Sequence, residues 1–187
     1  FYENNEIDAE VAVISVTDED ATDSYIYSIT GGADASKFKI LGDKLLLGSV
    51  IDYEANTSLE VELTVTDSQG STYDETFTLA VNNVNEAPTD ITLSNHVINE
   101  NSAAGTVIGS FTVTDTDNAL GDSHVFSFEN GSLRSGSFLL DGNTLKVDGV
   151  LNYEGKSSYF LLVEATDLAG NSYSKQFQIS LNDVNEK

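Results

Sequence analysis

Acidic residues recur in the same order in the two halves of this 187-residue chain. Each half carries an early glutamate, an Asp-x-Asp, a Tyr-Glu pair, a Thr-Asp-x-x-Gly and an Asn-Glu tail. These positions are Glu3, Asp18, Asp20, Glu54, Asp67 and Glu86 in the first half and Glu100, Asp115, Asp117, Glu154, Asp167 and Glu186 in the second. Calcium takes about six to eight oxygen ligands, several of them from carboxylates, and separate loops can supply them. The repeated set therefore predicts calcium binding.

Other uses of these carboxylates fit the sequence less well. Zinc favours His and Cys ligands, and the chain has no cysteine and only two histidines, His96 and His124. Magnesium would take fewer ligands from the protein and keep more water. A helix-loop-helix calcium loop starting at Asp115 would need glycine and glutamate where Leu120 and Phe126 stand. An acidic surface that only maintains solubility is the alternative interpretation.

The chain repeats itself. An offset of 100 residues relates Glu54, Asp67 and Glu86 to Glu154, Asp167 and Glu186. Near the start of each copy the offset is 97, which relates Glu3, Asp18 and Asp20 to Glu100, Asp115 and Asp117. We therefore expect two domains, over residues 1–87 and 88–187, the first without an opening strand. The chain is expected to be a fragment of a larger exported protein.

Apolar residues alternate with polar ones within each copy, which is the period of a β-strand. The clearest runs are Leu59, Val61, Leu63 and Val65 in the first copy and Tyr159, Leu161, Val163 and Ala165 in the second. Short runs of this kind, about seven per copy and separated by Gly, Asn and Asp, predict an all-β fold. The expected architecture is two tandem seven-stranded Greek-key β-sandwiches of immunoglobulin-like type, joined end to end.

The net charge disfavours some classes of partner, and the catalytic motifs that the sequence lacks argue against an enzyme. Eight Lys and Arg residues against 31 Asp and Glu give a formal net charge of −23, which disfavours binding to nucleic acid or anionic membranes. The chain lacks a Gly-x-Ser-x-Gly motif, a P-loop and a cysteine nucleophile. Ser123 and His124 are neighbours in sequence, which does not by itself make a triad. We expect no enzymatic activity, no nucleic-acid partner and no direct insertion into a membrane.

Several of these motifs resemble those of the cadherin domains, and particularly of their bacterial cadherin-like relatives. Ile51-Asp52-Tyr53-Glu54 and Leu151-Asn152-Tyr153-Glu154 are similar to the family's Leu-Asp-Arg-Glu. Asn83-Val84-Asn85-Glu86-Ala87-Pro88, which holds the only proline, resembles its interdomain linker. The chain departs from the family pattern at Asn83, Glu86 and Asn152, where the family has Asp.

The resemblance implies that calcium ions lie between consecutive domains. It implies one to three Ca²⁺ ions at the middle junction, with ligands drawn from the first copy, the linker and the second copy. The expected ligands are Glu3, Asp52, Glu54, Asn83, Val84, Asn85, Glu86, Asp115, Asp117 and Asp167. Half sites are expected upstream at Asp18, Asp20 and Asp67, and downstream at Glu100, Glu154, Asp183, Asn185 and Glu186.

The expected function is that of a calcium-rigidified extracellular repeat module, acting in cell adhesion as a stalk or extender of a large cell-surface or secreted adhesin. The same resemblance implies a bacterial source. Its expected partners are neighbouring cadherin-like repeats of the same chain. The alternative is a calcium-dependent module that binds polysaccharide, or identical repeats on another cell. The chain has no tryptophan, so the tryptophan-anchored strand exchange of vertebrate adhesive cadherins is not available to it.

Overall fold

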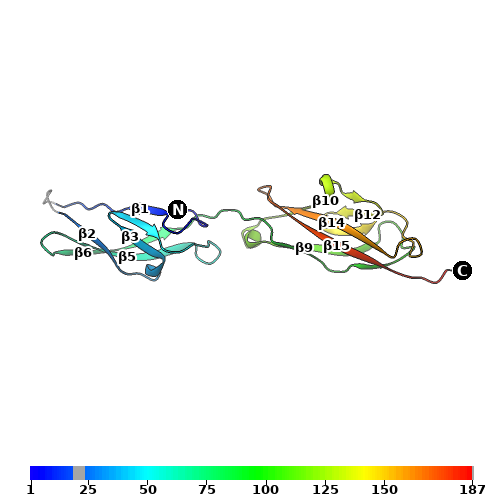
Figure 1. The fold of residues 1–187 in the computed structure, drawn as a ribbon, viewed down its shortest axis with the longest axis horizontal. Helices are drawn as coiled ribbons and strands as arrows, with labels where there is room; N and C mark the ends of the chain where they lie inside the picture. Colours follow the sequence, from blue (N-terminus) through cyan, green and yellow to red (C-terminus); the bar gives the residue numbers. More distant parts are fainter. Residues whose placement is uncertain (19–23, 187) are drawn as a thin grey trace. The chain divides into compact units, whose positions relative to one another are not determined.

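The chain folds into two units, Phe1–Val84 and Asn85–Lys187, in a computed structural model that describes residues 1–18 and 24–186 (Figure 1). The division lies between Val84 and Asn85, slightly before the boundary expected after residue 87. Strands and short 3-10 turns are the regular elements of the described residues, and none of their helices has the length and apolar character needed to cross a membrane.

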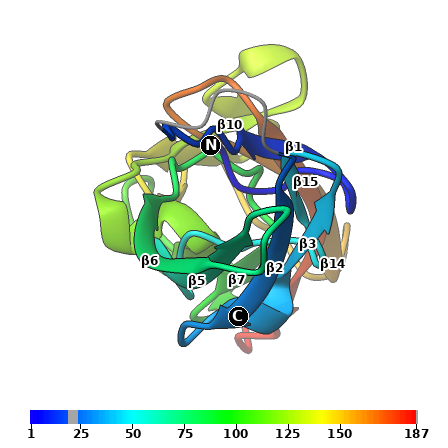
Figure 2. The ribbon, with the colours of Figure 1, turned by 90° about the vertical axis from the view of Figure 1, so that its left-hand side faces the viewer.

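The first unit consists of two antiparallel three-stranded sheets. Its strands are β1 (Glu10–Val13), β2 (Ile26–Gly31), β3 (Phe38–Leu41), β4 (Lys44–Leu47), β5 (Ser58–Thr66) and β6 (Thr72–Ala80). One sheet has the order β1-β4-β3 and the other β2-β5-β6. Figure 2 views this unit end-on, with β6, β5 and β2 adjacent in one layer. An isolated parallel bridge joins Tyr2 to Asn82 beyond the end of β6.

The second unit repeats this arrangement with additional strands. They are β7 (Asp90–Leu93), β8 (Val97–Asn99), β9 (Val107–Thr114), β10 (Val125–Phe128), β11 (Arg134–Ser135), β12 (Phe138–Asp141), β13 (Thr144–Val147), β14 (Ser158–Thr166) and β15 (Ser172–Asn182). The sheets have the orders β11-β12-β13-β9-β7 and β10-β14-β15-β8, and β8 pairs with β15 in parallel. The opening strand is thus divided between the two sheets, because β7 joins one and β8 the other.

The predicted all-β fold class is confirmed, with small differences of detail. The described residues contain three 3-10 turns where no helical stretch was expected: η1 (Ala35–Lys37), η2 (Thr116–Leu120) and η3 (Glu129–Gly131). The second unit exceeds the expected seven strands because its opening strand is divided and the two-residue β11 is added. The described part of the first unit has no counterpart of β7.

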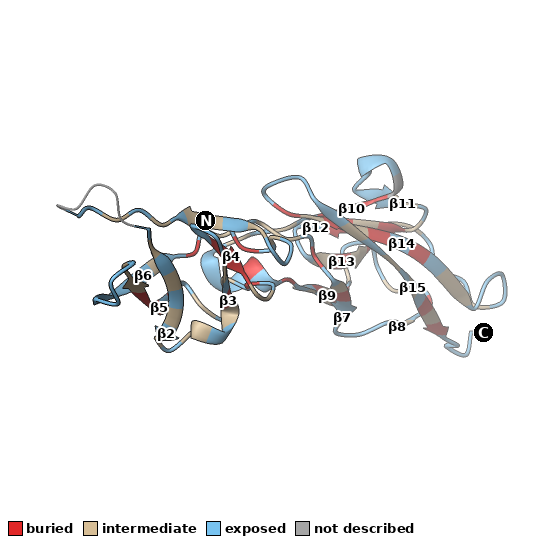
Figure 3. Cartoon of the chain, turned by 60° about the vertical axis from the view of Figure 1, so that its left-hand side comes forward, coloured by how far each residue is buried: buried red, intermediate tan, exposed pale blue. Residues whose placement is uncertain are grey.

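The alternating residues of the long strands form the two cores. Leu161, Val163 and Ala165 of β14 are buried in the second unit, as are Leu59 and Val61 of β5 in the first. Figure 3 shows buried residues alternating with exposed ones along the strands. Side chains two residues apart along a strand point to the same face of a sheet. The core therefore takes one face of each sheet, and the other face and the loops can carry the acidic residues.

Candidate metal centres

Five expected ligands come together at one end of the second unit: Asn85, Glu86, Asp115, Asp117 and Asp167, here called the Asp cluster. Asp115 directly follows β9 and Asp167 directly follows β14, and these strands belong to different sheets. Asn85 Nδ2 donates to Asp167 Oδ2 at 2.8 Å, and Glu86 N donates to Asp117 Oδ2 at 2.8 Å. The start of this unit is therefore held against the loops that carry its three aspartates.

The Asp-x-Asp segment is shaped by a local cap. Asp115 is the N-cap of η2, in extended conformation, and its Oδ1 accepts from Asp117 N at 2.9 Å. Asp favours this position because its short side chain reaches the free backbone N–H groups of the first turn. Asp115 and Asp117 are both buried, although burial of an ionised carboxylate is costly unless it is paired.

Asp167 is buried in a similar way at the end of β14. Its Oδ1 accepts from Asn171 N at 2.8 Å, and its Oδ2 accepts from Asn171 Nδ2 at 3.0 Å in addition to Asn85. Burial opposes ionisation, but these hydrogen bonds outweigh it and lower the pKa of Asp167 below its ordinary value. The donors are neutral amides, which orient the carboxylate without cancelling its charge.

The first unit carries a cluster of Glu3, Asp52 and Glu54, here called the first Glu cluster, whose carboxylate oxygens lie within 4.8 Å of one another. Glu3 is buried and accepts from Tyr53 N at 2.6 Å and from Val84 N at 2.9 Å. Its carboxylate thus ties the chain start to the Tyr-Glu loop and to the last residue of the unit. The expected ligand Asn83 lies half-buried next to Val84.

The second unit repeats this cluster with Glu100, Glu154 and Asp183, here called the second Glu cluster, again within 4.8 Å. Glu100 is buried and accepts from Tyr153 N and from Val184 N, each at 2.8 Å. Asn152 takes the place of Asp52, and each turns its Oδ1 to a backbone N–H of the same loop. The downstream residues Asn185 and Glu186 are exposed, and Asn101 Nδ2 donates to Glu186 Oε1.

Comparison with known proteins identifies the modules. A model of the Cadherin domain family matches residues 94–182, within the second unit. Human Cadherin-related family member 2 is 26% identical over 96% of the chain, and mouse Protocadherin Fat 2 is 26% identical over 86%. The chain is built of tandem cadherin-like domains.

Solved structures agree with this fold over both cadherin-like domains. The crystal structure of human Protocadherin-24 EC1-2 has a TM-score of 0.80 and 23% identity, covering 98% of this chain and 93% of that one. The Protocadherin GammaB4 extracellular domain has a TM-score of 0.71 and 21% identity, covering 98% of this chain and 30% of that one. The chain spans only 15% of the human relative and 4% of the mouse relative.

The upstream half site of the first cadherin-like domain is less complete. Asp67 Oδ1 accepts from Ser71 N and Gln69 N, each at 2.8 Å, which lowers the pKa of Asp67. Asp18 is exposed, and Asp20 lies outside the described residues. Among the residues that the structure describes, Asp18 and Asp67 do not join a group of three that could hold a metal.

Sequence reasoning missed two residues beside the Asp cluster of the second cadherin-like domain, Asp122 and His124. Both side chains are almost fully buried, and His124 precedes β10. Two-residue alternation places His124 on the same face as the buried Phe126 and Phe128. A histidine continuing an inward-facing row was the signal that could have revealed it.

Acid should weaken the second domain partly through Glu100. Its hydrogen bonds from Tyr153 N and then Val184 N lower its pKa below the ordinary 4.5. A lowered folded-state pKa adds stability that is present above the unfolded value and is lost as the pH falls through the folded value. Glu100→Gln should therefore have a lower unfolding free energy at neutral pH, and should lose less of it than the unmodified protein as the pH falls. Urea midpoints in calcium-free buffer, from neutral pH to about pH 3, measure this; parallel curves for both proteins would contradict it.

Proposed function

We propose that this chain is a calcium-binding segment of an extracellular adhesion protein, in which calcium fixes the angle between successive cadherin-like domains. The observation that carries the proposal is the repeated Glu cluster. In each domain a buried glutamate is held by the same two backbone donors, next to two exposed carboxylate positions. A buried glutamate held twice in the same way, beside Glu54 in one domain and Glu154 in the other, fits a role between repeats better than incidental surface charge.

The donor atoms of these clusters suit calcium. They are carboxylate and amide oxygens, which Ca²⁺ prefers, and loops at the ends of strands supply them. The first Glu cluster, Asn83, Val84 and the Asp cluster would hold one to three ions, the ligand set expected from the sequence. Extracellular modules of this kind bind calcium with a dissociation constant of about 10⁻⁴–10⁻³ M.

Charge repulsion explains why such a junction would need the metal. Two carboxylates about 4 Å apart repel by about 1–4 kcal/mol at effective dielectric constants of about 80 to 20. The first Glu cluster gathers three carboxylates in the unit that ends at Val84, and the Asp cluster has four in the unit that begins at Asn85. Bound calcium would supply the positive charge that allows ligands of two domains to share one site. Without it the carboxylates favour separation, so the linker should bend freely.

The partners follow from the same assignment. The relatives are cadherins and protocadherins, a family of extracellular adhesion domains, which favours neighbouring repeats as partners and homophilic contact with identical repeats. They give no support to a polysaccharide partner or to catalysis. They are animal proteins, so a bacterial source also stays a prediction from the sequence.

Small-angle scattering with calcium and with a chelator tests the proposal. We expect a larger maximum dimension and a narrower distribution of shapes when calcium is bound, because the two domains are then held at one angle. The matched sample replaces calcium by the same concentration of magnesium, which should leave the flexible profile. Superimposable profiles in calcium and chelator would overturn the proposed function.

A further inference from the structure

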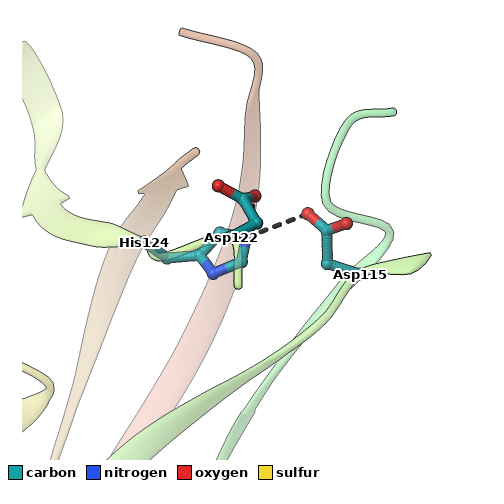
Figure 4. Close-up of side chains that lie close together, drawn as sticks. All are labelled: Asp115, Asp122 and His124. Carbon is teal, nitrogen blue, oxygen red and sulfur yellow. Dashed lines mark hydrogen bonds and ion pairs between the residues drawn. The ribbon is translucent and has the colours of Figure 1, made fainter. Parts of the chain in front are cut away.

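Asp115, Asp122 and His124 form a buried triad at one end of the second domain. One ligand atom from each lies within 4.8 Å of the others. His124 Nε2 is 2.9 Å from Asp115 Oδ2 and 3.5 Å from Asp122 Oδ2. The side chains of Asp115, Asp122 and His124 are 0%, 5% and 7% exposed. Figure 4 shows the three side chains close together, with a dashed line between the His124 ring and the Asp115 carboxylate.

The second carboxylate of the triad has an oxygen that the protein does not satisfy. Asp122 Oδ1 accepts from Ser123 N at 2.8 Å and from Leu168 N at 3.3 Å. Its Oδ2 is buried and makes no hydrogen bond. Since buried polar atoms are nearly always paired, an oxygen left without a donor and facing an imidazole points to a missing partner.

A single proton on His124 Nε2 cannot balance the charges of both carboxylates, Asp115 and Asp122. The Nε2 atom of His124 carries at most one hydrogen, and the shorter contact directs it to Asp115 Oδ2. Even a protonated ring leaves two buried carboxylates with one positive charge between them. A divalent cation in the place of that proton would bind all three ligand atoms and balance both carboxylates.

The spacing of the ligand atoms suits a small tetrahedral ion. Zinc bonds of about 2.0–2.1 Å to His nitrogen and carboxylate oxygen place neighbouring ligands about 3.3 Å apart. The two distances from His124 Nε2, 2.9 and 3.5 Å, lie on either side of this value. Small side-chain shifts would bring the Asp115 and Asp122 oxygens into the same range. Calcium prefers oxygen ligands alone and more of them, so the imidazole favours zinc.

We propose that Asp115, Asp122 and His124 bind Zn²⁺, with water as the fourth ligand. The other oxygens of both carboxylates are fixed by backbone donors, Asp117 N for Asp115 and Ser123 N for Asp122. Such outer contacts orient metal ligands in advance. The other metal-compatible groups among the described residues consist of Asp and Glu alone. Asp115 is the one residue that this zinc site shares with the proposed calcium ligands.

Titration of the full chain with zinc chloride in calcium-free buffer tests the site, because calcium would compete for Asp115, which both proposed sites share. Isothermal calorimetry should give one tight zinc site per chain, separate in affinity from weaker binding to the all-carboxylate clusters. His124→Ala should weaken binding by at least about 100-fold, and Asp122→Asn, which keeps the shape of the side chain, should weaken it strongly. His96→Ala removes the other histidine of the chain and should bind as the unmodified protein does. Equal zinc affinity in His124→Ala and the unmodified chain would overturn the proposal.

A spectroscopic measurement on the unmodified chain keeps the proposal testable if His124→Ala fails to fold. Zinc should shift the Nε2 resonance of His124 in nitrogen-15 spectra and leave the His96 ring unmoved. Zinc binding that shifts neither ring would contradict the site. Failure of the calcium experiments would leave this result unchanged, because the measurement reads the histidine ring directly.

Discussion

Replacing Asp117 by alanine should abolish most of the calcium-dependent rise in the melting temperature of the second domain. Asp117 is buried, and its Oδ2 accepts from Glu86 N at 2.8 Å. It therefore stands where the linker and the Asp-x-Asp loop meet. Loss of its carboxylate removes both an expected calcium ligand and the acceptor that holds Glu86.

The size of the calcium effect follows from linkage. An ion that binds the folded state alone stabilises it by RT ln(1 + [L]/Kd), which is about 1.4–2.7 kcal/mol at about 10 mM calcium and a Kd of about 10⁻³–10⁻⁴ M. For a domain of about 100 residues this corresponds to a rise of about 5–20 °C. Scanning calorimetry of the full chain with calcium and with chelator measures the shift in both proteins.

Asp141→Ala is the matched control for this experiment. It also removes one carboxylate from the second domain, but Asp141 lies at the end of β12, where it pairs with Lys146. Its calcium shift should equal that of the unmodified chain. If Asp117→Ala keeps the full calcium-dependent rise in melting temperature, the ions bind elsewhere. If Asp141→Ala loses as much of that rise as Asp117→Ala does, the loss reflects the change in net charge and not the removal of a ligand.

The fold could be predicted from the sequence because strand alternation is a local property. Leu161, Val163 and Ala165 reveal the buried face of β14 without any knowledge of its neighbours. The division of the opening strand between two sheets has no such local signal. It depends on β7 pairing with β9 and β8 pairing with β15, which are tertiary contacts.

The candidate sites likewise have a part that the sequence predicts and a part that depends on tertiary contacts. The types and spacing of Glu3 and Glu100 mark them as expected ligands, and their role as calcium ligands stays a prediction. Their backbone donors, from the Tyr-Glu loop and from residues more than 80 positions away, could not be read from spacing. The grouping of His124 with Asp115 and Asp122 was missed because the fold of the η2 loop, and not their spacing, brings these three side chains together.

Glu3 should stabilise the first domain even when no calcium is present. Its buried carboxylate accepts from Tyr53 N at 2.6 Å and from Val84 N at 2.9 Å. Hydrogen bonds to a charged group contribute about 1.5–3 kcal/mol each, and a buried donor left unpaired adds its own penalty. Since the freed N–H groups can regain water in part, we expect Glu3→Ala to cost about 2–4 kcal/mol of unfolding free energy.

Urea unfolding in chelator measures this loss, and two further variants test its cause. Glu6→Ala removes an exposed carboxylate three positions away and should leave the first domain nearly unchanged. Glu3→Gln should fall between the two, because its carboxamide offers one acceptor oxygen to two N–H donors and turns a third N–H toward them. If Glu3→Ala unfolds at the same urea concentration as Glu6→Ala, the carboxylate serves the metal alone. If Glu3→Gln matches the unmodified protein, the two backbone donors do not need the second oxygen.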